Sequence, residues 1–213
     1  MYTKRIFSNP HGQSFHYLHY APAEVSEPLP LIVFLHGYGE CGPADGSDVD
    51  RVAKHGYFKY IAQDKDYPCI MVAPQCPKGK YWGSFVESLN RFLDAMLAEN
   101  KVDPNRVYLT GLSMGGTGTW LWSLDNPDRF AAIAPICGEG ISWYGVNLAK
   151  LPCRIFHGDC DDSVSPHASL AMVEKINRNG GRAELIILPG VKHNAWDRAY
   201  DDDLIAWFMR HSR

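Results

Sequence analysis

The residue pattern best suited to chemistry in this sequence is a serine between two glycines, Gly111-x-Ser113-x-Gly115. It follows an apolar run at 107–112 and precedes a segment compatible with a helix from Thr117 onward. Such a serine can be held on a sharp strand-to-helix turn, with its hydroxyl exposed and its backbone strained. The flanking residues must be small because the strand and helix backbones approach closely. The pattern alone is loose, since glycine-rich turns also contain it by chance.

A serine hydroxyl is a poor nucleophile without a base and a group that orients the base. Three aspartates, Asp159, Asp161 and Asp162, follow a predicted strand at 153–157. Asp161 is the best candidate for the orienting acid from its position in the loop. Asp159 and Asp162 remain alternatives, although such residues more often serve turns or helix caps.

His193 is the candidate base among nine histidines, because it lies in a glycine-containing loop between a predicted strand and the last predicted helix. His36 and His157 each precede a glycine at the end of a predicted strand. We interpret both as packing and hydrogen-bonding residues. Ser113, Asp161 and His193 follow one another in the order nucleophile, acid and base that triads on an α/β sheet use.

Acyl transfer also needs backbone N–H groups that stabilise an oxyanion. The amide of Met114, directly after the serine, can supply one. The loop His36-Gly37-Tyr38-Gly39 follows another predicted strand, and the amide of Tyr38 can supply the second. The alternative interpretation of this loop is a purely structural turn.

Strand-like and helix-like segments alternate along most of the chain, which predicts an α/β sandwich with a mainly parallel sheet and helices on both faces. We expect one domain over residues 1–213, with functional groups at the carboxyl ends of the strands. An antiparallel hairpin is predicted from 2–8 and 14–20, and a turn at 103–105. The other predicted strands are 31–35, 70–73, 107–112, 130–136, 153–157 and 184–188, and the helices are 52–63, 84–99, 117 onward, 166–178 and 197–210.

Composition excludes several classes of partner. A formal charge of −3 over 213 residues gives no basic surface for nucleic acid or anionic membrane. The sequence shows no secretory signal and no apolar run long enough to span a membrane. The six cysteines have neither C-x-x-C nor zinc spacing, so we expect reduced thiols in a cytoplasmic protein. Acyl transfer through a serine needs no metal and no organic cofactor, and we expect neither.

Several motifs carry a family resemblance: LHGYGE at 35–40, APQCP at 73–77 with Trp82, YLTGLSMGG at 108–116 with Trp120, APICG at 134–138, HGDCD at 157–161 and HNAWD at 193–197. Over nearly the whole chain from residue 31, the sequence resembles α/β-hydrolase esterases related to phospholipase/carboxylesterases, feruloyl-esterase-like proteins and predicted prolyl-oligopeptidase-like peptidases. The resemblance implies an α/β-hydrolase fold, with Ser113 as nucleophile, His193 as base and Asp161 as its orienter. It also implies that the Tyr38 and Met114 amides form the oxyanion hole.

The sequence departs from the family pattern at two places. Many relatives have a small residue where Tyr38 stands, so its ring is expected to narrow the acyl side of the site. The acidic loop is one residue longer than the family's Asp-x-x-Val-Pro, which affects the assignment of Asp161.

Only residues 138–150 separate two predicted strands after the serine, which is too short for a helical lid and predicts no sizeable cap domain. We expect an open site lined by aromatic residues, with Trp82, Trp143 and Trp196 as candidate substrate contacts. The predicted function is a serine carboxylesterase for short-chain acyl or aryl esters, with a small-molecule ester as its partner and a homodimer as its expected assembly. The alternatives are a feruloyl- or acetyl-type carbohydrate esterase, a small peptidase or amidase and, more distantly, a non-catalytic binding protein on the same fold.

Overall fold

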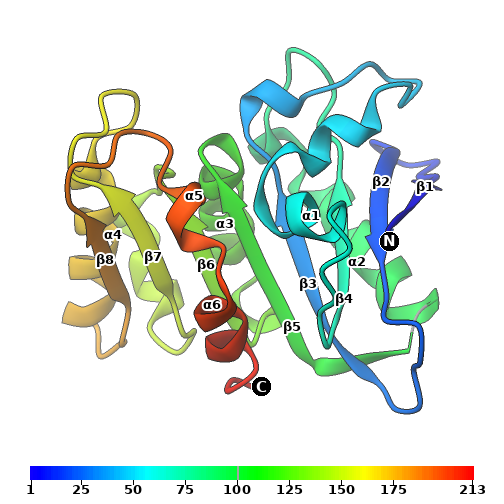
Figure 1. Ribbon diagram of the computed structural model, residues 1–213. Coiled ribbons are helices and arrows are strands. Elements are labelled where there is room, and N and C mark those ends of the chain that lie inside the picture. The colour runs from blue at the N-terminus through cyan, green and yellow to red at the C-terminus, as the bar shows by residue number, and fades with distance from the viewer. Residues whose placement is uncertain (100) are drawn as a thin grey trace.

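The computed structural model describes residues 1–99 and 101–213, which fold around one eight-stranded sheet (Figure 1). Strands β1 and β2 form the predicted antiparallel hairpin, and β2 is also antiparallel to β4. The remaining neighbours are parallel, in the order β4-β3-β5-β6-β7-β8. The predicted fold class is thereby confirmed. The strands are Thr3–Phe7 (β1), Phe15–Tyr20 (β2), Leu29–Leu35 (β3), Ile70–Pro74 (β4), Val102–Leu112 (β5), Ala132–Ile136 (β6), Arg154–Gly158 (β7) and Glu184–Leu188 (β8).

Helices cover both faces of this sheet, with α2, α3 and α4 on one side and α1, α5 and α6 on the other (Figure 1). Strand β3 is apolar throughout because it serves both cores: Val33 faces the first group of helices, whereas Ile32 and Phe34 face the second. The helices are Gly56–Ile61 (α1), Val86–Glu99 (α2), Met114–Asp125 (α3), Pro166–Arg178 (α4), Trp196–Ala199 (α5) and Asp202–Phe208 (α6).

Three predicted elements differ in detail from the structure. The helix expected at 197–210 is two short helices, since the Asp201 side chain accepts a hydrogen bond from the Leu204 N–H and begins α6 afresh. The segment 52–63 divides at Gly56, whose φ is +63°, into the 3-10 helix η2 (Val49–Lys54) and α1. The turn predicted at 103–105 is an irregularity inside β5, where the pairing with β3 shifts register.

Two features of the sheet matter for the site. Strand β3 lies beside β5, with Leu35 paired to Gly111, so the loops after both strands meet at one edge. Between β6 and β7 the chain forms only the 3-10 helix η5 (Ser142–Leu148), as expected for a fold without a large cap.

Among the described residues, no helix combines the length and apolarity that a membrane span requires.

Candidate active site

Ser113 lies on the sharp turn between β5 and α3, with φ 53° and ψ −118°, a conformation that L-residues rarely adopt. The turn needs glycine on either side. A Cβ at Gly115 would overlap the carbonyl oxygen of Leu35, and one at Gly111 would overlap the carbonyl of Gly115. Strand β5 and helix α3 therefore meet closely enough to force the serine into this strained position.

A continuous chain of hydrogen bonds runs from Ser113 through His193 to Asp161. Ser113 Oγ lies 2.7 Å from His193 Nε2, and His193 Nδ1 lies 2.7 Å from Asp161 Oδ2. A carboxylate only accepts, so Nδ1 carries the proton, and Nε2 is left to accept from the serine hydroxyl. The Asp161 side chain is fully buried, and the imidazole is partly exposed.

Asp161 is the aspartate that the structure places against His193. Its Oδ1 accepts the N–H groups of Ser163 and Val164, each at 2.9 Å. Burial favours the neutral acid, but these backbone donors and His193 outweigh it and lower the pKa of Asp161 below its ordinary value. Asp159 instead accepts from the Gly190 N–H at 2.7 Å and links two loops, while Asp162 is exposed.

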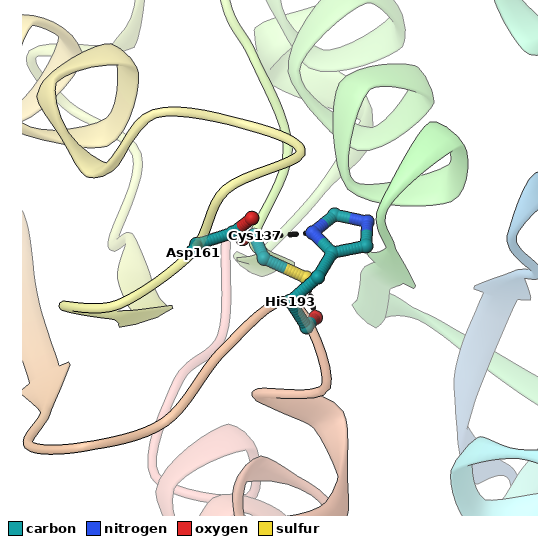
Figure 2. A group of neighbouring side chains, drawn as sticks. All are labelled: Cys137, Asp161 and His193. Carbon is teal, nitrogen blue, oxygen red and sulfur yellow. Dashed lines mark hydrogen bonds and ion pairs between the residues drawn. The ribbon is translucent and has the colours of Figure 1, made fainter.

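Cys137 lies next to this chain of hydrogen bonds, at the end of β6 (Figure 2). Its Sγ, the Asp161 carboxylate and a His193 ring nitrogen lie within 4.8 Å of one another, a spacing that a metal ion could use. However, Asp161 and His193 already bond to each other, and burial raises the pKa of the Cys137 thiol to about 12. The neutral thiol donates to the His193 carbonyl at 3.3 Å, which favours a structural role for Cys137 in holding the His193 backbone.

The side chain of His36 fixes the loop after β3 through two hydrogen bonds. His36 Nδ1 lies 2.6 Å from the Gly37 carbonyl, and His36 Nε2 accepts the Cys76 N–H at 2.9 Å. These partners fix one neutral tautomer, and complete burial lowers the pKa of His36 to about 4. The predicted packing and hydrogen-bonding role of His36 is thus confirmed.

The orientation of one peptide group follows from this contact. Because the peptide is trans, the Gly37 carbonyl bound by His36 requires the Tyr38 N–H to point the opposite way. The Met114 N–H opens helix α3 and so has no acceptor within the helix. The close approach of Gly115 to the Leu35 and His36 carbonyls brings this helix end beside the loop.

The three candidate tryptophans occupy different environments. Trp82 is 1% exposed and donates to the His36 carbonyl at 3.0 Å, so its predicted contact with substrate is wrong. Trp143 is 83% exposed and lines a surface pocket of about 280 Å³ with residues of α4, to which Ser113 does not contribute. Trp196 packs edge-on against the His193 ring, with ring centroids 5.4 Å apart. Trp196 is therefore the one of the three that adjoins the site.

One neighbour of Asp161 went unrecognised in the sequence. His157, in β7, places Nε2 3.2 Å from Asp161 Oδ2, and both side chains are fully buried. The i,i+4 spacing of the two residues in the HGDCD motif could have pointed to this contact.

Comparison with known proteins agrees with this fold. Residues 16–203 match the profile of the Dienelactone hydrolase family. The crystal structure of a thermostable esterase superposes with a TM-score of 0.84 at 28% identity, covering 100% of this chain and 63% of that one. A ferulic acid esterase structure superposes with a TM-score of 0.74, covering 99% and 98% of the two chains; its 16% identity shows the fold alone.

Among curated sequences, the chain is similar to the bifunctional acetylxylan esterase/xylanase XynS20E of Neocallimastix patriciarum. The two are 28% identical over 150 residues, which cover 67% of this chain and 21% of that protein. The chain spans between 21% and 39% of the length of the curated relatives that it matches.

Proposed function

The chain belongs to the Dienelactone hydrolase family, and we propose that it is a serine carboxylesterase with Ser113, His193 and Asp161 as its catalytic triad. The observation that carries the proposal is the pair of 2.7 Å contacts that join the three side chains. The position of Ser113 at the strained turn before α3 supports its role as the nucleophile.

In the proposed reaction, His193 Nε2 takes the Ser113 proton as Oγ attacks the ester carbonyl. The imidazolium then gives this proton to the leaving alcohol, and water hydrolyses the acyl-enzyme by the same roles in reverse. Asp161 holds the proton on Nδ1 and stabilises the imidazolium. The Tyr38 and Met114 N–H groups would receive the oxyanion, a role supported by the fixed Gly37 carbonyl and the free end of α3.

We propose esters with short acyl or aryl groups as the substrates, because the chain between β6 and β7 forms no large cap over the site. A specific alternative is an acetyl-type carbohydrate esterase, favoured by the similarity to a protein named acetylxylan esterase. A cytoplasmic location is also a proposal, supported by six free cysteines of which five are buried.

The test is turnover of p-nitrophenyl acetate together with fluorophosphonate labelling. Replacing Ser113 by alanine should abolish labelling and lower kcat by about 10⁴-fold or more. His193→Ala should lower kcat about as much as replacing Ser113 and His193 together, because the residues act as a unit. Ser47→Ala, at an exposed serine in the loop before η2, is the matched control and should keep full activity. Turnover that survives Ser113→Ala would refute the proposal.

Substrate class is resolved by a second comparison. The ratio of kcat/KM for acetylated xylan to that for p-nitrophenyl acetate should be well below one for a small-ester hydrolase. A ratio above one would favour the carbohydrate esterase.

A further inference from the structure

His157 is a buried titratable residue that the proposed mechanism leaves unused. It lies in β7, the strand beside β6, and its side chain is 0% exposed. Both of its ring nitrogens have polar partners. A buried histidine with satisfied nitrogens is usually a packing residue, so the identity of those partners decides its role.

The partners of His157 define its tautomer. Nε2 lies 2.9 Å from the Val164 carbonyl, which can only accept, so Nε2 carries the hydrogen. In the neutral ring, Nδ1 then accepts from the Ser169 hydroxyl of α4 at 2.7 Å. The imidazole is thus held in one orientation by a loop carbonyl on one side and a helix hydroxyl on the other.

The same Nε2–H also faces the proposed triad. Asp161 Oδ2, 3.2 Å away, is the oxygen that accepts from His193 Nδ1. The other oxygen, Oδ1, is occupied by the N–H groups of Ser163 and Val164. We propose that His157 is a positioning residue, which shares its Nε2–H between the Val164 carbonyl and Asp161 Oδ2 and so sets how strongly Asp161 holds the proton on His193. This inference rests on the proposed triad.

The direction of the effect follows from electrostatics. A donor on Oδ2 withdraws negative charge from the contact with His193, and in this dry environment the effect is larger than in water. Without it, Asp161 would stabilise the His193 imidazolium more strongly, so a higher pH would be needed to produce the free base. Among the residues that the structure describes, the titratable groups facing Asp161 are His193 from the loop after β8, Cys137 from the end of β6 and His157 from β7.

The experiment compares His157→Leu, which removes the donor, with His157→Gln, whose amide can donate to Val164 and Asp161 and accept from Ser169. For each variant, kcat and KM for p-nitrophenyl acetate are measured across pH and normalised to fluorophosphonate-titrated sites. His157→Leu should leave KM unchanged and move the acid limb of the kcat and kcat/KM profiles upward by at least half a pH unit, so that kcat per titrated site falls about threefold or more at pH values on that limb. His157→Gln should return both kcat and the acid limb most of the way to the wild-type values. His167→Gln, at an exposed histidine of α4, should resemble the wild type.

A purely structural role would reduce the number of titrated sites and leave the acid limb and kcat per site unchanged, and this result would overturn the inference. If His157→Leu does not fold, the wild-type protein with ¹⁵N-labelled histidine supplies the second measurement. Its His157 ring should show the Nε2–H tautomer, and the Nδ1–H tautomer would overturn the inference. A wild-type protein without turnover or Ser113 labelling would instead refute the proposed function, and this inference with it.

Discussion

His36 couples the loop after β3 to pH. The folded protein holds its pKa at about 4 through burial, against about 6.5 in the unfolded chain. The unfolded state therefore binds more protons between these values, so the stabilisation from neutral His36 is complete above pH 6.5 and is lost as the pH falls toward 4. The lowered pKa of Asp161 acts in the same direction, because its carboxylate must be protonated in acid.

We predict that His36→Gln flattens the dependence of the free energy of unfolding on pH. Urea denaturation at pH 7 and pH 4.5 should show that the wild type loses about 2–3 kcal/mol more than this variant over the interval, an estimate from the shift in pKa. His11→Gln, at an exposed histidine, should follow the wild type. Parallel curves for wild type and His36→Gln would show that His36 does not contribute.

Prediction from sequence worked unevenly at this scale. Ser113 and His193 could be chosen as candidates because their loops follow strands and contain glycine, and the structure brings their side chains together. Asp161 was preferred from its position and from the family resemblance, but the residues alone left Asp159 and Asp162 open, since the contact with His193 depends on how the loop folds back so that Oδ1 meets the Ser163 and Val164 N–H groups. Trp82 was misassigned because its acceptor, the His36 carbonyl, lies 46 residues away in the sequence and no local pattern reports it.

The β5–α3 turn allows a prediction at the scale of an element. Gly115→Ala would push a methyl group into the carbonyl oxygens of Leu35 and His36, and neither backbone can move without disturbing β3. Overpacking of this kind costs about 1–3 kcal/mol or more. In a chain of this length, thermal denaturation should show a loss of several degrees, together with a loss of esterase activity.

Gly39→Ala is the matched control for this change. A Cβ at Gly39 would meet nothing within 4 Å, and its φ is not positive. It should leave the melting temperature within about 1 °C. Equal losses in both variants would mean that the close approach of α3 to the Leu35 and His36 carbonyls at the end of β3 is not what requires glycine at position 115.

Element boundaries show what periodicity can reveal and what it cannot. Apolar residues at helical spacing located α2, which presents one buried face. The same spacing runs through 197–210, yet the chain breaks between α5 and α6 where Asp201 offers a better partner to the Leu204 N–H. Periodicity therefore indicated the buried residues of this segment but not the break in its backbone, which the capping side chain of Asp201 marks.

At the scale of the whole molecule, the alternation of strands and helices predicted the parallel sheet, and the similarity to the thermostable esterase agrees with it. The alternation alone did not predict the strand order, because that order depends on which crossovers pack together. That order places β3 between β4 and β5, so residues from four separate loops converge at the carboxyl edge of the sheet. The candidate site is in this sense a property of the whole topology.

The two edges of the sheet differ in a way that bears on solubility. Edge strand β1 exposes Lys4 and Arg5, whose charges oppose the docking of another strand. On the other edge, β8 pairs with β7 alone among the described residues and carries the apolar run 185–188, with Ile187 41% exposed. Partial unfolding near this edge would offer open backbone groups on an apolar strand to other molecules, which is a route to aggregation.

We therefore predict that Ile187→Lys slows aggregation on mild heating, because a charge on the exposed face of β8 disfavours intermolecular strand pairing. Light scattering at a temperature below the melting transition measures the rate, and turnover of p-nitrophenyl acetate checks that the site is intact. Ile6→Lys, at an exposed residue of the already charged strand β1, should change the rate little. Edge strand β8 would then limit the concentration at which the protein remains monodisperse.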